Sequence, residues 1–329
     1  MEKIPLHEKP EKTEEQSRAE TAEKVVTFLE KTEAYEKIEG LLDGQKDKIS
    51  FEDFKDLLVR LNGIIRDIPI HERSFDGAQV HVEGWMDTYK PPRQKDKEGI
   101  LERAYDATDK VERGDEKYLI PAVINAVHLF IDGNGRTARL LYQLLEKHNS
   151  KEDFLTVVKK AMQKDGRYDT LNVNPGLIAS QIEDIVYARH GWNSEHTRIG
   201  EFRAGFITME MEKIPRDHPS YDILKTMVRE SKVDATLMIT ALNEVATQEQ
   251  SKKILAKDGR ISLIKMSEVL STEELEEVIE KFWEIKKEYV DILIDIFVNP
   301  DEYKTVDDKE EIKVKDLFIK KVKAEAEMK

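Results

Sequence analysis

Apolar residues recur along most of the chain at the three- and four-residue spacing of amphipathic helices. The first pattern runs from about Ser17 toward Leu42, and the second runs from about Ser50 to Arg66, where Ser50 has a side chain suited to a helix N-cap. The apolar positions of the second pattern are Phe51, Phe54, Leu57, Leu58 and Leu61. Two helices are therefore predicted in the first part of the chain.

Residues 78–90 show a different pattern, with period two. Apolar and polar residues alternate from Ala78 to Glu83, Gly84 permits a turn, and a second short run follows from Met86 to Lys90. This is the one segment for which the sequence predicts a β-hairpin.

Residues 97–115 are predicted to form a charged helix, which Gly114 separates from the next one. Pro121 is expected in the first turn of that next helix, because its missing N–H costs little there.

The second half of the chain is predicted to be helical. Helical patterns occupy Phe154–Met162 and Leu177–His190, and residues 220–329 are charged and poor in glycine. Within this last region, an apolar stripe at heptad spacing consists of Leu275, Val278, Phe282, Ile285, Tyr289, Ile292 and Ile296.

Such a stripe has to be buried. An intramolecular helix bundle is the expected explanation, and a homodimer seam or a surface that docks a target protein are the alternatives. Asn299 and Pro300 are predicted to end this helix. The final run, rich in Lys and Glu, is interpreted as a solvated helix or a frayed tail.

Composition narrows the classes of function. At 329 residues, the chain is long enough for a core domain and an appended one. The net charge of -14 argues against nucleic acid as a partner. No apolar run approaches the length of a membrane span, and the N-terminus is charged rather than signal-like. The absence of cysteine excludes a disulfide framework and fits a cytoplasmic protein.

The strongest chemical signal is the stretch from His128 to Arg139, with the sequence His-Leu-Phe-Ile-Asp-Gly-Asn-Gly-Arg-Thr-Ala-Arg. It connects an apolar helical run, Tyr118–Val127, to a second helix, Thr137–Lys147. Glycines let a backbone approach a ligand closely, and successive N–H groups at the start of a helix attract anions. The connection is therefore predicted to be an anion-binding nest formed by Gly133, Asn134 and Gly135.

Four side chains around this loop suit phosphate chemistry. Arg136 and Arg139 are three residues apart and share a helix face, so both can reach a polyphosphate. Asp132 offers a hard oxygen ligand for Mg²⁺, and His128 is a base that titrates near neutral pH. The set predicts a phosphoryl or nucleotidyl transfer site. The alternative is an ordinary helix C-cap turn, with a hydrogen-bonded histidine and solvated arginines.

This stretch resembles the motif of the Fic family, His-x-Phe-x-(Asp/Glu)-Gly-Asn-Gly-Arg-x-x-Arg, and it meets every defined position. The resemblance implies an enzyme that transfers AMP from ATP to a Ser, Thr or Tyr hydroxyl of a target protein. It further implies that His128 deprotonates the hydroxyl, that Asp132 holds Mg²⁺ and that Phe130 anchors the loop. The implied phosphate-binding residues are Gly133, Asn134, Gly135, Arg136 and Arg139.

The two motif glycines help to choose among reactions. A relative that phosphorylates its target has Lys in place of the second glycine, and the phosphocholine-transferring branch has Ala in place of the first. Gly133 and Gly135 are both present, which favours AMP transfer. Removal of AMP, or transfer of another phosphate-containing group by the same site, is the enzymatic alternative. A non-catalytic helical interaction protein is the alternative outside enzymes.

Two further features of the family have counterparts near the N-terminus. Many members have an inhibitory helix with the pattern (Ser/Thr)-x-x-x-Glu-(Gly/Asn), and the nearest match places Glu39 before Gly40 but has Tyr35 at the first position. Glu39 is thus a candidate inhibitory residue, with a plain surface glutamate as the alternative. The predicted hairpin corresponds to the flap, where the target protein would bind near Gln79 to Lys90; a hairpin that only covers the core is the alternative.

The predicted fold is mainly α: a Fic-type helical core with a small β-hairpin flap, followed by a helical C-terminal region. Residues 1–17 are expected to be a disordered tail, 18–195 a Fic-like catalytic domain with an N-terminal helix, and 196–329 a helical C-terminal domain. The expected partners are ATP with Mg²⁺ and a target protein, without nucleic acid or membrane. A cytoplasmic location is expected, and export into a host cell as an effector stays open.

Overall fold

The computed structural model describes residues 13–31, 49–69, 72, 91–146, 152–153, 155–157, 159, 173–190, 208–231, 235–254 and 260–327, and the statements below concern these residues. Of these residues, 75% are helical, and a small two-stranded antiparallel sheet is also present, which confirms the mainly α class. The α-helices are α1 (Glu14–Lys31), α3 (Phe51–Ile65), α4 (Gln94–Ala107), α5 (Glu116–Val127), α6 (Asn134–Leu144), α8 (Ala179–Arg189), α10 (Tyr221–Ser231), α11 (Ala235–Val245), α12 (Gln248–Ile254), α13 (Leu263–Val269), α14 (Thr272–Val298) and α15 (Val314–Glu327).

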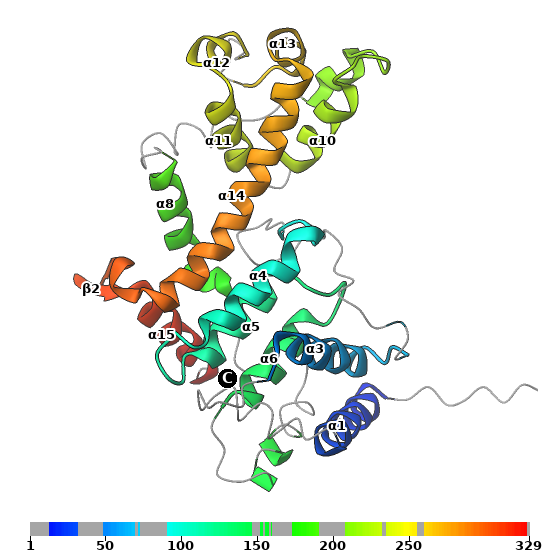
Figure 1. Cartoon of the computed structure of the whole chain (residues 1–329), viewed down its shortest axis with the longest axis vertical. Helices are drawn as coiled ribbons and strands as arrows, with labels where there is room; N and C mark the ends of the chain where they lie inside the picture. The colour runs from blue at the N-terminus through cyan, green and yellow to red at the C-terminus, as the bar shows by residue number, and fades with distance from the viewer. Residues whose placement is uncertain are drawn as a thin grey trace, which may run out of the picture.

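Helix α5 lies at the centre of the group that surrounds the motif. Its sequence is apolar on all sides, which is typical of a helix enclosed by others, and most of its residues are buried. Helices α4, α6 and α14 pack against it, and α3 packs against α6 and α1. Figure 1 shows α3, α4, α5 and α6 together in one part of the molecule. The His128–Arg139 stretch is the link between α5 and α6.

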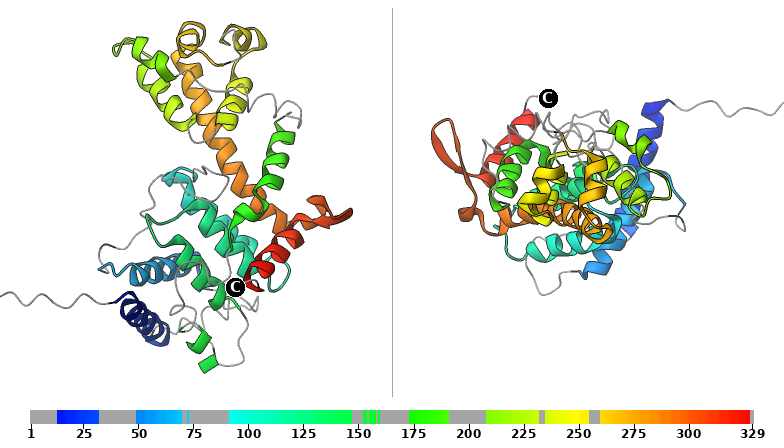
Figure 2. Two further views of the ribbon diagram at one scale, coloured as in Figure 1. Left: turned by 180° about the vertical axis from the view of Figure 1, so that it is seen from behind. Right: turned by 90° about the horizontal axis from the view of Figure 1, so that it is seen from above.

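Helix α14 connects this group to the remaining helices. Ser271 and Glu274 form a capping box at its start: Ser271 Oγ accepts from the Glu274 N–H at 3.1 Å, and Glu274 Oε2 accepts from the Ser271 N–H at 2.7 Å. The helix contacts α10 and α11 as well as α4, α5, α8 and α15. Figures 1 and 2 show it running from the group of α10, α11, α12 and α13 down to the level of α15.

All seven residues of the predicted α14 stripe are buried within the chain. The apolar core is continuous from Val25 in α1 to Val322 in α15, and it includes this stripe. The intramolecular explanation for the stripe is therefore confirmed.

Several predicted elements agree with the structure. Helix α3 begins after Ser50, whose hydroxyl accepts a hydrogen bond from the Asp53 N–H at 3.1 Å, and it ends at the C-cap Arg66. Residues Pro175–Ile178 form the 3₁₀-helix η2, which leads into α8 close to the predicted start at Leu177. Gly114 has a φ of +97° and separates α4 from α5, as expected from the ease with which glycine adopts such angles.

Other boundaries differ from the prediction. Helix α1 begins at Glu14, so part of the predicted disordered tail is helical. Helix α4 ends at Ala107, ahead of the predicted limit at residue 115. Helix α5 begins at Glu116, which puts Pro121 inside the helix rather than in its first turn. The prediction took the first apolar residue as the helix start, but the preceding charged turn is also helical.

The C-terminal run differs most from expectation. After the 3₁₀-helix η4 (Pro300–Glu302), the strands β1 (Lys304–Asp307) and β2 (Glu310–Lys313) pair as an antiparallel hairpin that projects from the body of the molecule (Figure 2). The expectation of a helix agrees with α15 (Val314–Glu327), but the hairpin before it and the buried face of that helix differ from the interpretation of this run as a solvated helix or a frayed tail. Helix α15 follows, and it buries an apolar face that includes Phe318, whose ring lies 5.9 Å from that of Phe297.

Some predictions fall outside the described residues. They include the hairpin at residues 78–90, where the target protein is expected to bind, and the candidate inhibitory residue Glu39. The end of the first predicted helix near Leu42 and most of the predicted helix Phe154–Met162 also lie outside them. Among the helices that the structure describes, none is both long enough and apolar enough to cross a membrane.

Candidate phosphate-transfer site

His128 is the C-cap of α5 and turns the chain toward the loop. Its backbone adopts a left-handed conformation, with φ 51° and ψ 62°, and its N–H donates to the Ile124 carbonyl at 3.1 Å. Such angles are unfavourable for a residue with a side chain, so neighbouring contacts must hold them. The turn directs Leu129 and Phe130 into the core, where both are fully buried.

Asn134 closes the loop that follows. Its side-chain oxygen accepts from the Phe130 N–H at 2.9 Å, and its side-chain nitrogen donates to the Phe130 carbonyl at 2.6 Å. Both backbone groups are buried, so they need these partners. Asn134 and the buried ring of Phe130 therefore fix the loop from two sides.

Gly133 and Gly135 are required for different reasons. Gly133 has a φ of +79°, and a Cβ there would lie 2.9 Å from the side-chain nitrogen of Asn62. A Cβ on Gly135 would lie 3.3 Å from Nη1 of Arg139. The first glycine allows the turn against α3, and the second lets the Arg139 guanidinium lie close to the start of α6.

Asn62 on α3 fastens the loop to its neighbour helix. It is 1% exposed, and its side-chain nitrogen donates to the Asp132 carbonyl at 3.0 Å and to the Thr137 hydroxyl at 3.1 Å. Its side-chain oxygen accepts from Arg66 Nη1 at 3.3 Å. One buried amide thus holds both the loop and the first turn of α6 in place.

Asp132 is the most exposed acidic group of the site. Its side chain is 71% exposed, one carboxylate oxygen accepts from the Gly133 N–H at 2.6 Å, and the other accepts from Arg136 Nη2 at 3.1 Å. The donors expected to hold phosphate therefore hold this carboxylate. They form a small anion site, since each is directed at a negatively charged oxygen.

The imidazole of His128 is half-buried and carries no charge at neutral pH. Burial is the main cause that lowers its pKa to about 4, the positive charge of Lys97 acts in the same direction, and Asp132 acts against both. Lys97 is 1% exposed, and its ammonium donates to the His128 carbonyl at 2.8 Å. Neutral imidazole is the form that accepts a proton.

The side chains of this site are compatible with a Mg²⁺ ion for which bound phosphate supplies further ligands. In the described part of the chain, no group of three or more His, Cys, Asp and Glu side chains is arranged to hold a metal ion alone. Mg²⁺ commonly uses one or two carboxylates and takes its other ligands from phosphate and water. The exposed carboxylate of Asp132, beside the Gly133 N–H and the Arg136 guanidinium, suits that mode.

Asn62 and Lys97 are the contributors that the sequence prediction missed. Both could have been recognised from the sequence as buried polar residues, because each occupies a position on the apolar stripe of its helix. Asn62 follows Leu58 by four residues, and Lys97 precedes Ile100 and Leu101 by three and four. The partners of Asn62 are 70 and 75 residues away in the sequence, so they could not be assigned from it.

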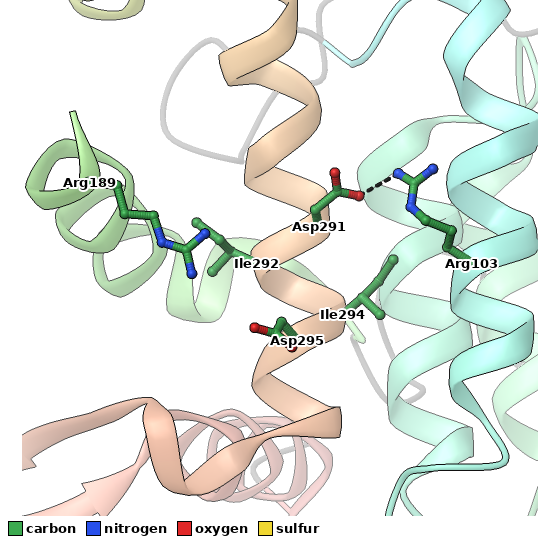
Figure 3. A pocket seen from close by; sticks show the side chains of 6 residues that line it. All are labelled: Arg103, Arg189, Asp291, Ile292, Ile294 and Asp295. Carbon is green, nitrogen blue, oxygen red and sulfur yellow. Dashed lines mark hydrogen bonds and ion pairs between the residues drawn. The ribbon is translucent and has the colours of Figure 1, made fainter.

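A hollow of about 350 Å³ lies away from the motif, between α4, α8 and α14. Figure 3 shows Arg103 and Arg189 on opposite sides of α14, with Asp291 and Asp295 between them. Arg103 is paired with Asp291, and Arg189 donates to Glu288 and to the Tyr303 hydroxyl. These arginines join helices, so their charges are already used within the fold.

Comparisons of the chain with protein-family models, with curated proteins and with solved structures found no match in any of the three. The functional interpretation therefore depends on the motif and on the geometry around it.

Proposed function

We propose that the chain is a protein adenylyltransferase of the Fic type, which transfers AMP from ATP to a hydroxyl side chain of a target protein. The observation that carries the proposal is the complete motif at the α5–α6 connection, where a neutral histidine and a set of anion-directed donors belong to one short loop. A plain helix-cap turn would need neither two arginines nor a glycine with an amide directed at an anion.

The proposed reaction assigns one task to each part of the site. The His128 imidazole accepts the proton of the target hydroxyl, whose oxygen attacks the α-phosphorus of ATP. The bond from that phosphorus to the bridging oxygen breaks, and pyrophosphate leaves. Arg136, Arg139 and the amides at the start of α6 stabilise the negative charge on the phosphates. Asp132 would hold Mg²⁺, whose charge would offset part of the same negative charge.

ATP binding requires an exchange of partners within the loop. The Gly133 N–H and Arg136 Nη2 bond to the Asp132 carboxylate at 2.6 and 3.1 Å. Phosphate oxygens would replace that carboxylate, which would leave Asp132 available to Mg²⁺. The exchange costs little, because an exposed ion pair contributes on the order of 1 kcal/mol or less.

The experiment compares three proteins in a cell lysate with Mg²⁺ and ATP labelled on its α-phosphate: wild type, His128→Ala and, as a control, His218→Ala. His218 is in the turn before α10, where its ring accepts from the Ser220 N–H at 3.2 Å. We expect protein labelling by wild type and by His218→Ala, and no labelling by His128→Ala, which should still bind ATP.

Labelling by His128→Ala at the wild-type rate would refute the role of His128 as the base. If wild type binds ATP with Mg²⁺ but labels no protein, the loop would be a nucleotide sensor in a non-catalytic interaction protein. If AMP is instead released from modified target proteins, the site would catalyse the reverse reaction.

A further inference from the structure

Helix α4 contains a lysine on its buried face. Lys97 occupies the same stripe as Ile100, Leu101 and Ala104, all of which are fully buried, and Lys97 itself is 1% exposed. Burying an ammonium group is strongly unfavourable unless partners compensate for the lost hydration. A lysine at such a position therefore needs a specific partner.

The carbonyl of His128 is one such partner, at 2.8 Å from the Lys97 ammonium. His128 is the C-cap of α5, where carbonyl groups lack partners within the helix and the helix dipole is negative. A cation is favoured at this end of a helix. Lys97 thus caps α5 from a neighbouring helix and does so at the residue proposed as the base.

The bonded carbonyl belongs to a residue with an unfavourable backbone. The φ of 51° at His128 lies in the left-handed region, which residues other than glycine adopt uncommonly, although Asn, Asp and His do so more often than the rest. The hydrogen bond from Lys97 fixes the peptide that follows this residue. It thereby fixes the turn from which the imidazole projects.

We propose that Lys97 is a positioning residue for His128. Lys97 holds the left-handed turn of the base and sets the charge around its imidazole. The inference rests on the proposed function, because it assigns Lys97 a part in the same reaction. Lys97 does not touch the reacting atoms in this proposal and acts only through His128.

Charge gives the proposal a measurable consequence. Among the described residues, the charged groups that act on the His128 imidazole are Lys97 on α4, which lowers its pKa, and Asp132 in the loop, which raises it. Removing the positive charge should therefore move the titration of His128 to higher pH. A lysine that only fills space would leave the titration unchanged.

The test measures this titration by nuclear magnetic resonance of the histidine Cε1–H groups in the full chain. The chain has 8 histidines, so the spectrum of His128→Gln identifies the signal of His128. Lys97→Met removes both charge and donor, Lys97→Gln removes the charge but keeps a donor, and Lys97→Arg keeps both. We expect a higher titration midpoint in the first two variants and a midpoint near that of wild type in the third.

Lys315→Met is the matched control. Lys315 is also buried, at 3% exposed, and its ammonium lies 2.7 Å from Asp115, just before the opposite end of α5. Lys315→Met also removes a buried lysine and should lower stability, but it changes nothing near His128. Its titration midpoint for His128 should equal that of wild type.

The same variants are then assayed for AMP transfer as a function of pH. In Lys97→Met, kcat should fall by roughly ten- to a hundredfold, because a small misplacement of a catalytic group has effects of this size. KM for ATP should stay unchanged, and the acid limb of the profile should move to higher pH. Lys97→Arg should restore most of the loss.

The outcomes separate this inference from the proposed function. If the midpoint of His128 is the same in wild type, Lys97→Met and Lys97→Gln, the inference is refuted, whatever the transfer activity. If the midpoint rises but wild type transfers no AMP, the proposed function fails while the influence of Lys97 on His128 stands. If Lys97→Met does not fold, Lys97→Gln alone decides the question.

Discussion

Replacing Gly133 with alanine tests the packing of the loop against α3. Gly133 has a φ of +79°, and an alanine Cβ would lie 2.9 Å from the side-chain nitrogen of Asn62. Contacts below about 3.0 Å between such atoms do not occur without a shift. Asn62 is 1% exposed, so it has little room to move away.

The expected loss of stability has two parts. Alanine in a left-handed conformation costs about 1 kcal/mol more than glycine. Displacing Asn62 weakens its hydrogen bonds to the Asp132 carbonyl and the Thr137 hydroxyl, each of which contributes about 1 kcal/mol net. We therefore expect Gly133→Ala to lower the free energy of unfolding by about 2–3 kcal/mol.

Urea denaturation of matched variants separates these parts. Gly135→Ala is the control, because its Cβ meets only Nη1 of Arg139, at 3.3 Å, and that guanidinium is the mobile end of a long side chain. It should change stability by less than about 1 kcal/mol. In an Asn62→Ala background, Gly133→Ala should cost only the conformational part, about 1 kcal/mol. Equal costs in both backgrounds would refute the expected clash between the alanine Cβ at position 133 and the side chain of Asn62.

Three shorter predictions concern other parts of the fold. Asn134→Ala leaves the buried N–H and C=O of Phe130 without these partners and should lower the free energy of unfolding in urea by about 2–4 kcal/mol. A loss under about 1 kcal/mol would contradict the stabilising role of the two Asn134 hydrogen bonds. The pKa of His128 is depressed from 6.5 to about 4, so its contribution to stability is complete above pH 6.5 and is lost as the pH falls toward 4. Wild type should therefore lose stability relative to His128→Gln over this range. Parallel curves of unfolding free energy against pH for the two proteins would disprove the shift. Ser271→Ala removes the capping box of α14 and should cost about 1 kcal/mol, measured by the same denaturation, with Ser267→Ala as a control within α13.

The sequence predicted those features that depend on local pattern. The start of α3 was predictable because Ser50 and the apolar spacing that follows are adjacent in the chain. The burial of the α14 stripe followed from its regular spacing alone. The connection between α5 and α6 was predictable because glycines and charged residues interrupt two apolar helical runs.

Features that depend on distant contacts or unusual turns were not predicted. The β1–β2 hairpin turns at Asp308 and Lys309, with φ values of 49° and 76°, although such angles are usually signalled by Asn-Gly or Asp-Gly. Lys97 lies on the apolar stripe of its helix in the sequence, but its contact with the His128 carbonyl, 31 residues away, could not be assigned from that pattern. The depressed pKa of His128 likewise depends on burial among several helices, which no local pattern expresses.

The most direct test of the central claim is a comparison of two labels in one reaction. Purified protein, Mg²⁺ and cell lysate are incubated with ATP labelled either on the α-phosphate or on the γ-phosphate, with wild type and His128→Ala in parallel. We expect that the α-label alone becomes attached to protein, and that His128→Ala attaches neither label. Attachment of the γ-label would show phosphoryl transfer instead of AMP transfer, and α-label attached equally by His128→Ala would contradict the proposed role of His128 as the base.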